Sequence, residues 1–253
     1  MKNTMKVENV LNCSFNNWFS QFQRVTMKSI ILPLSIEFVD YLLADGVFLP
    51  KCEEHKFPLN EDDSDTEGWS DSDEDEEDKA PHFPEFDAKV KSAIQALGGN
   101  VFPKLNWSCP KDANWIALNK SLCCSCVTDI YLLLKSSDFI SHDLTQPFKY
   151  CLDLPRAKEK FEETPLKFYL ILRKWIEIDP STEYRCFVKN NNLIAISQRD
   201  YTNFYDHITY QKDDIIEDIS TFFEVHIKDN FPDENYVFDV YRNRKVSFTL
   251  QSY

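Results

Sequence analysis

The chain has 253 residues, a length typical of one large domain or two small ones. Hydrophobic residues make up 43% of it, with 20 Phe, 11 Tyr and 5 Trp, which is enough for a packed core. The longest apolar runs are far too short to cross a bilayer, and residues 1–11 lack the apolar stretch of a secretory signal. Eight cysteines without such a signal indicate reduced thiols, so we expect a cytoplasmic protein with no membrane partner.

The net charge of −14 comes mostly from one segment. Residues 61–78 hold 12 Asp and Glu and no Lys or Arg, and without them the net charge would be −2. Prolines and like charges dominate this region, so we expect residues 59–81 to be a disordered acidic insertion. Ser70 and Ser72 each precede acidic residues, a pattern that an acid-directed kinase would read.

Glycine is scarce, and its positions exclude two nucleotide-binding classes. The four glycines are Gly46, Gly68, Gly98 and Gly99. Neither a GxGxxG nor a GxxxxGK[ST] motif can be drawn from them, which excludes the Rossmann and P-loop fingerprints. A phosphate bound by this chain must therefore be held by individual side chains.

Ahead of the acidic insertion, the sequence predicts two helices and one strand. A helix over residues 14–22 is capped by Ser14, and a second helix over residues 35–44 is capped by Ser35. Branched residues between them predict a strand over residues 24–34.

After the insertion, helices come first and strands dominate later. A helix over residues 83–97 has one apolar stripe, and Thr128 is expected to cap another helix that ends near residue 136. A charged stretch over residues 153–164 predicts a loop. The remaining expected elements are strands at 101–104 and 166–175, a hairpin of 183–189 with 193–198, a helix at 213–226, and a hairpin of 236–241 with 245–250. Because strands and helices do not alternate regularly, we predict an α+β fold.

Four places in the strands carry residues suited to a nucleotide. Lys104 follows Pro103, which restricts the backbone and gives a stiffly held point charge for a phosphate. The run Leu172–Ile176 places two cations and a tryptophan at a strand end, where adenine could bind. Taken alone, the run is better explained by an edge strand with outward charges and an inward tryptophan.

The other two places are a pair of charges and a single carboxylate. Glu183 and Arg185 share one face of a strand, either a ligand site or an ordinary surface pair. Asp239 lies inside an apolar strand, where a carboxylate needs a partner such as Mg²⁺ or an arginine.

Taken in order, these motifs resemble one family, the cell division cycle protein 123 family. The resemblance rests on VFPKLNWS (101–108), KSSDFI (135–140) with LTQPF (144–148), LRKW (172–175), EYRCFVKN (183–190), ISQRDYT (196–202) and VFDVY (237–241). It implies an ATP-grasp-like protein of two lobes, whose antiparallel sheets enclose a nucleotide cleft. Its parts would be an N-terminal part (1–58), the acidic insertion (59–81), a first lobe (82–165) and a second lobe (166–253).

The same resemblance implies a function and a set of roles. The family acts as an ATP- and Mg²⁺-binding assembly chaperone for eukaryotic translation initiation factor 2, through that factor's gamma subunit. Lys104 and Arg185 would contact phosphates, Glu183 the ribose, and Asp239 the Mg²⁺. The remaining expected positions are a loop of Asn106 and Trp107, an adenine hinge of Arg173, Lys174, Trp175 and Ile176, and Ser197 in the pocket.

The C-terminal part departs from the family pattern. The family continues after Asp239 to an Asp-Phe-Asn-Pro type segment with two more metal ligands, whereas no Asp or Glu follows Asp239 here. We therefore expect a truncated second lobe, an incomplete metal site and weakened binding of Mg²⁺-ATP.

Other functions follow less well from the sequence. An ATP-grasp ligase that forms an acyl phosphate and a nucleotide-free interaction module remain alternatives to the chaperone, which we expect to be a monomer and not an enzyme. Cys123, Cys124 and Cys126 lack a second ligand pair, so no zinc site is predicted. The sequence has no basic patch with interleaved aromatic residues, so direct nucleic-acid binding is not expected.

Overall fold

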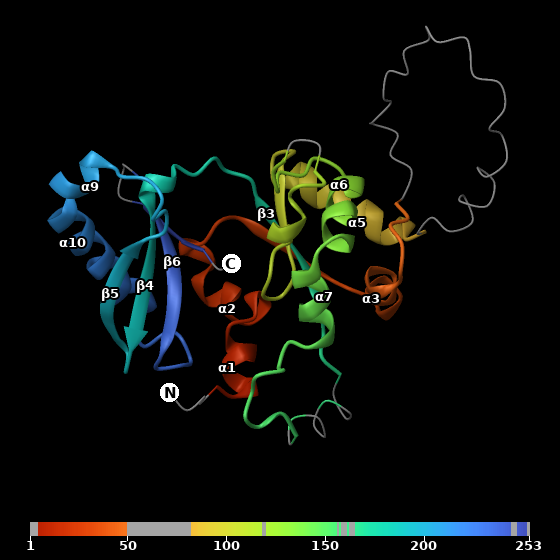
Figure 1. The fold of residues 1–253 in the computed structure, drawn as a ribbon, viewed down its shortest axis with the longest axis horizontal. Coiled ribbons are helices and arrows are strands. Elements are labelled where there is room, and N and C mark those ends of the chain that lie inside the picture. Colours follow the sequence, from red (N-terminus) through yellow and green to blue (C-terminus); the bar gives the residue numbers. More distant parts are fainter. Residues whose placement is uncertain are drawn as a thin grey trace, which may run out of the picture.

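The computed structural model describes residues 5–49, 82–117, 120–155, 157, 161, 165–243 and 247–251. Its strands form two antiparallel sheets, as Figure 1 shows, and helices pack on each. The expected α+β fold with antiparallel sheets is therefore confirmed. The acidic insertion, with Ser70 and Ser72, lies outside the described residues.

The first sheet has the strand order β1-β3-β2 and combines distant parts of the chain. Its strands are β1 (Ser29–Pro33), β2 (Val101–Lys104) and β3 (Tyr169–Lys174). β3 is central and pairs Ile171 with both Ile31 and Lys104. The lobe boundary expected at residue 166 thus falls just before a strand that completes the first sheet.

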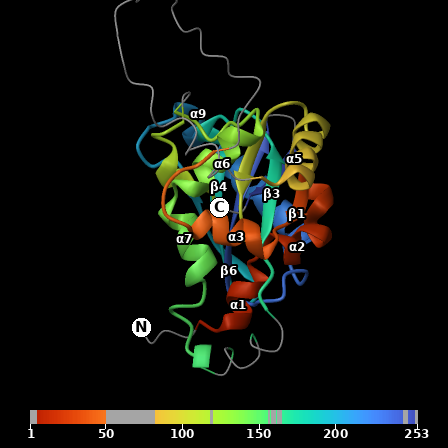
Figure 2. The ribbon, with the colours of Figure 1, turned by 90° about the vertical axis from the view of Figure 1, so that its right-hand side faces the viewer.

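The two faces of the first sheet meet different partners. Alternation along β3 sends Leu170 and Leu172 into one core, while Ile171 belongs to another. The first core is built with helices that Figure 2 shows in front of the strands. These helices are α3 (Ile36–Leu43), α5 (Pro84–Ala96), α6 (Val127–Lys135) and α7 (Asp138–Thr145).

The second sheet has the strand order β5-β4-β6-β7. Its strands are β4 (Glu183–Lys189), β5 (Asn192–Gln198), β6 (Tyr236–Asn243) and β7 (Ser247–Gln251). One face packs on α10 (Lys212–Phe222) and the π-helical turn Phe223–Ile227, where Phe223 stacks on Phe238 with ring centroids 6.1 Å apart. The other face therefore carries Glu183, Arg185 and Asp239.

The N-terminal helices close the space between the sheets from one side (Figure 1). They are α1 (Val7–Asn12) and α2 (Phe15–Phe22). The aromatic residues of α2 join the core of the second sheet, and α9 (Asp206–Tyr210) precedes α10. Four short 3-10 or π turns complete the described elements: Gln23–Val25, Lys111–Ala113, Pro180–Thr182 and Phe223–Ile227.

Several sequence predictions are confirmed in detail. The Ser35 hydroxyl accepts a hydrogen bond from the Phe38 N–H at 3.2 Å, as expected of a cap. Gly98 and Gly99 have φ values of +99° and +91°, which end α5 in a conformation that favours glycine. Asn190 and Asn191 adopt φ values of +49° and +57°, so asparagines do supply the hairpin turn between β4 and β5.

Other predictions were wrong. The strand expected from residue 24 begins at Ser29, because residues 23–25 continue α2 as a 3-10 turn. Cys126, not Thr128, precedes the first residue of α6. The loop expected over residues 153–164 contains helical residues at 154, 155, 157 and 161. The helices α1, α7 and α9 were not anticipated, since each has eight residues or fewer and a weak apolar pattern.

Candidate functional site: a pocket between the two sheets

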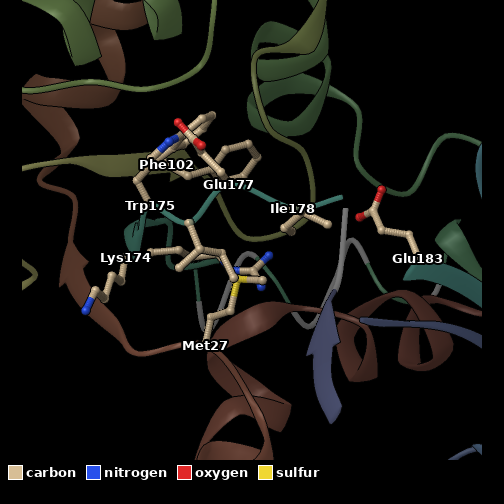
Figure 3. A pocket seen from close by; sticks show the side chains of 9 residues that line it. Met27, Phe102, Lys174, Trp175, Glu177, Ile178 and Glu183 are labelled. Carbon is tan, nitrogen blue, oxygen red and sulfur yellow. The ribbon is translucent and has the colours of Figure 1, made fainter. Parts of the chain in front are cut away.

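A pocket of ≈ 350 Å³ lies where the first sheet meets the start of the second. Figure 3 shows its lining, which comes from the segment before β1, from β2, the end of β3, the crossover to β4 and the first residue of β4. The lining residues are Met27, Phe102, Arg173, Lys174, Trp175, Ile176, Glu177, Ile178 and Glu183. A volume near 350 Å³ falls in the range of small-molecule sites, and the lining combines apolar side chains with charged ones.

Five predicted site residues are brought together here. They are the four hinge residues, Arg173 to Ile176, and the predicted ribose ligand Glu183. Figure 3 shows Lys174 extending its ammonium away from Ile178 and Glu183. The pocket thus places a tryptophan, aliphatic side chains and a carboxylate around one space.

The backbone of the hinge is partly committed to the fold. The Lys174 N–H donates to the Lys28 carbonyl at 2.8 Å, and the Trp175 N–H donates to the Asn100 carbonyl at 3.0 Å. A base in the pocket must therefore be recognised by other groups than these two donors. Their bonds fix the direction in which β3 leaves the sheet, which holds Trp175 at the pocket.

Lys104 and Arg173 form a buried cationic pair next to the pocket. Their exposed fractions are 1% and 2%, and they lie on the same face of neighbouring strands. Both sit over the ring of Phe15, with Lys104 Nζ 5.5 Å and Arg173 Cζ 6.0 Å from its centroid. An aromatic face attracts cations and so offsets part of the cost of burying them.

Burial changes the ionisation of Lys104. The loss of solvent, followed by the charge of Arg173, lowers the pKa of Lys104 to about 7. Cys109 and Asp143 act in the opposite direction and raise that pKa, and burial raises the pKa of Asp143 itself. Lys104 is therefore divided between its two protonation states near neutral pH, and a bound anion would favour the charged form.

Asn106 and Trp107 form hydrogen bonds that fix the loop after β2. Asn106 accepts a hydrogen bond from the Tyr169 N–H at 2.8 Å and donates to the Lys167 carbonyl at 3.1 Å. Trp107 Nε1–H donates to the Val10 carbonyl at 2.7 Å. These bonds join the loop after β2 to β3 and to α1, so both residues have a clear role in positioning Lys104.

On the second sheet, Asp239 is paired with two arginines. Arg185 lies directly opposite Asp239 and donates two hydrogen bonds to its carboxylate, at 2.7 and 2.8 Å. Arg199 approaches the second carboxylate oxygen at 3.4 Å. The Asp239 side chain is 5% exposed, so it needs such partners. Of the two partners foreseen for Asp239, an arginine is the one that the described residues provide.

Arg199 was missed by the sequence reasoning. It follows β5 in the segment ISQRDY, and only the pairing of β4 with both β5 and β6 brings it near Asp239. Ser197, which was predicted, lies opposite Arg185 on β5 but is exposed, and its hydroxyl donates to the Gln198 carbonyl at 3.1 Å.

The ion pair of Arg185 leads to a first prediction. Replacing Arg185 with Met should lower the free energy of unfolding by about 1–3 kcal/mol, because Asp239 stays buried with the longer Arg199 contact as its remaining ion pair. Urea unfolding measures this. Lys228→Met is the matched control, because it breaks a surface ion pair with Glu224 that contributes little to stability. Equal effects of the two substitutions would contradict the assignment.

In the described part of the chain, the His, Cys, Asp and Glu side chains do not gather into a metal site, since no group of three or more of them could hold a metal ion. The Cys124 and Cys126 side chains are buried, and burial raises the pKa of the Cys124 thiol. Within the described residues, none of the helices combines the length and apolar character that a membrane span requires.

Fold and site together define an α+β protein with two antiparallel sheets and a small-molecule pocket between them. A model of the D123 family matches residues 18–250, and the chain belongs to this family. The predicted resemblance to the cell division cycle protein 123 family is thereby confirmed.

Relatives and a solved structure agree with this assignment. A Xenopus tropicalis protein named translation initiation factor eIF2 assembly protein is 51% identical over 253 residues, covering 97% of this chain and 73% of that protein. Cell division cycle protein 123 of Aspergillus terreus is 43% identical over 235 residues, covering 92% of this chain and 55% of that protein. The structure of Cdc123 from Schizosaccharomyces pombe matches with a TM-score of 0.78 at 33% identity, covering 99% of this chain and 86% of that one.

Proposed function

We propose that this chain is an ATP-binding assembly factor for eukaryotic translation initiation factor 2. It acts in the cytoplasm as a monomer, through the gamma subunit of that factor. The names of its relatives support the assembly role. The pocket is the observation that supports nucleotide binding, because it gathers the four hinge residues and Glu183 around a space of ≈ 350 Å³.

The pocket residues suit a purine nucleoside. Trp175 and Ile176, with Phe102 and Met27, offer apolar surfaces to the faces of a base. Glu183 offers a carboxylate that can accept hydrogen bonds from ribose hydroxyls. Lys104 and Arg185 are the proposed phosphate ligands in an ATP-grasp-like arrangement of the two sheets.

The proposed Mg²⁺ ligand fits this scheme only if the ion pair on the second sheet opens. Asp239 is bonded to Arg185 at 2.7 and 2.8 Å, so the same carboxylate cannot keep both bonds and also bind a cation. A phosphate offers Arg185 equivalent acceptors, and Mg²⁺, when bound, would supply positive charge to Asp239. Arg199, which lies 3.4 Å from Asp239, is a second positive charge beside this carboxylate.

Binding of the gamma subunit tests the proposed role. The chain should capture the purified gamma subunit, and Mg²⁺-ATP should strengthen capture at least several-fold. Trp175→Ala should remove the effect of ATP, whereas Trp115→Ala should keep it, because Trp115 is 69% exposed and lies away from the pocket lining. If ATP changes capture of the gamma subunit by neither the wild type nor the two variants, a nucleotide-free interaction module would be favoured. ADP release with a carboxylate substrate would favour a ligase.

A further inference from the structure

A short segment after β5 exposes an unusual amount of aromatic surface. We call residues Asp200–Tyr210 the aromatic loop. Tyr201, Tyr210 and Phe204 are 91%, 86% and 80% exposed, more than the other large hydrophobic side chains in the described part of the chain. Single exposed apolar residues are ordinary, but three within ten positions form a patch that points to an interaction surface.

The aromatic loop is held in one conformation by Asp200. Its carboxylate accepts hydrogen bonds from the Thr202 N–H at 2.9 Å, the Thr202 hydroxyl at 2.6 Å, the Asn203 amide at 2.8 Å and the Tyr205 hydroxyl at 2.6 Å. These bonds, those from Thr202 foremost among them, hold the pKa of Asp200 well below its ordinary value. A loop ordered before binding presents its aromatic side chains with little further entropic cost.

The aromatic loop is also tied to the candidate nucleotide site. The Arg199 N–H, immediately before it, donates to the Glu183 carbonyl at 2.9 Å, and the Arg199 side chain lies 3.4 Å from Asp239. Glu183 lines the pocket. The second half of the aromatic loop is α9, which Figure 1 shows beside α10.

The charges around the aromatic loop restrict what can cover it. Residues 199–218 hold six carboxylates and two cations, and Asp206, Asp213 and Asp214 are all exposed. Such a surface repels nucleic-acid phosphates and anionic lipid headgroups. A second copy of this chain would present the same acidic segment and is repelled as well. A cationic protein surface is attracted, because aromatic faces and carboxylates both bind lysine and arginine side chains.

We propose that the aromatic loop is a docking site for a protein surface that presents lysine and arginine side chains. Tyr201 and Phe204 form its apolar centre, and the carboxylates at the start of α10 form its charged rim. This inference rests on the proposed function only in the choice of the gamma subunit as the probe. The chemistry of the aromatic loop does not depend on the nucleotide.

The test measures the affinity of the full chain for the purified gamma subunit at 50 and 300 mM NaCl. The Tyr201→Ala/Phe204→Ala protein should bind at least tenfold more weakly at both salt concentrations. Asp213→Asn/Asp214→Asn should bind three- to tenfold more weakly at low salt and nearly normally at high salt. Ile194→Ala/Val225→Ala is the matched control, since these side chains are 60% and 63% exposed elsewhere on the second half of the chain, and it should bind normally.

The outcomes separate this inference from the proposed function. Affinity for Mg²⁺-ATP should be unchanged in Tyr201→Ala/Phe204→Ala, which also serves as the folding check. Gamma-subunit binding within twofold of wild type in that variant would overturn the docking site. If the wild-type chain fails to bind the gamma subunit, the proposed function fails. A labelled nona-arginine peptide then replaces the gamma subunit as the probe of the aromatic loop. Equal peptide affinity of wild type and the double aromatic variant would again overturn the docking site.

Discussion

Replacing Phe15 with alanine should lower the free energy of unfolding by about 3–5 kcal/mol, the largest effect that we expect from a single substitution. Phe15 is fully buried at the start of α2. Its ring centroid lies 4.6 Å from that of Trp18 and 5.0 Å from that of Phe19. Removing it leaves a cavity and also takes an aromatic face away from two buried cations, Lys104 and Arg173.

Urea unfolding of Phe15→Ala and of Phe204→Ala measures this expectation against a matched control. Phe204 is 80% exposed, so its loss should change the free energy of unfolding by less than about 0.5 kcal/mol. A cost below 1 kcal/mol for Phe15→Ala would show that α2 does not seal the space between the sheets. Phe15→Leu should recover part of the stability but not the attraction of the ring for the cations.

The second large effect concerns Lys104 and has a defined pH dependence. Burial lowers the pKa of Lys104 from 10.5 to about 7 in the folded chain. Below pH 7 both the folded and the unfolded chain hold this proton, and the cost of burying the ammonium is fully present. As the pH rises from 7 towards 10.5, the unfolded chain binds more protons than the folded one, so the cost fades and the folded chain gains stability.

Lys104→Met isolates this contribution. The variant should be more stable than wild type at pH 6.5, and the difference should narrow by about 2–3 kcal/mol between pH 6.5 and pH 9. Comparing the two proteins at each pH removes the titration of the buried tyrosines and cysteines that both share. A difference that stays constant over this range would show that Lys104 keeps its charge in the fold.

The family resemblance allowed the residues of the pocket to be named from the sequence, and they lie close together in the chain. The hinge run Arg173–Ile176 ends one strand, and Glu183 begins the next, so one short crossover segment places them around one space. The hairpin turn at residues 190–191 could also be predicted from the sequence, since consecutive asparagines favour positive φ.

The buried ion pairs and the role of α2 could not be predicted in the same way. Phe15 meets Arg173 across more than 150 residues, and Arg199 meets Asp239 only through the order of three strands. An isolated carboxylate in an apolar strand indicates that a partner exists, but local patterns do not choose between a cation and an arginine. The prediction of the residue that caps α6 was wrong for a different reason. The sequence offers a good capping residue at Thr128, whereas the helix starts two positions earlier, with Val127 packed into the core.

The measurement that tests the central claim most directly is calorimetric binding of Mg²⁺-ATP to the wild-type chain, to Trp175→Ala and to Trp115→Ala. If the pocket between the sheets is the nucleotide site, wild type and Trp115→Ala should bind one ATP with equal affinity, and Trp175→Ala should bind at least tenfold more weakly. Equal affinities in all three proteins, or no binding by the wild type, would contradict the assignment of this pocket.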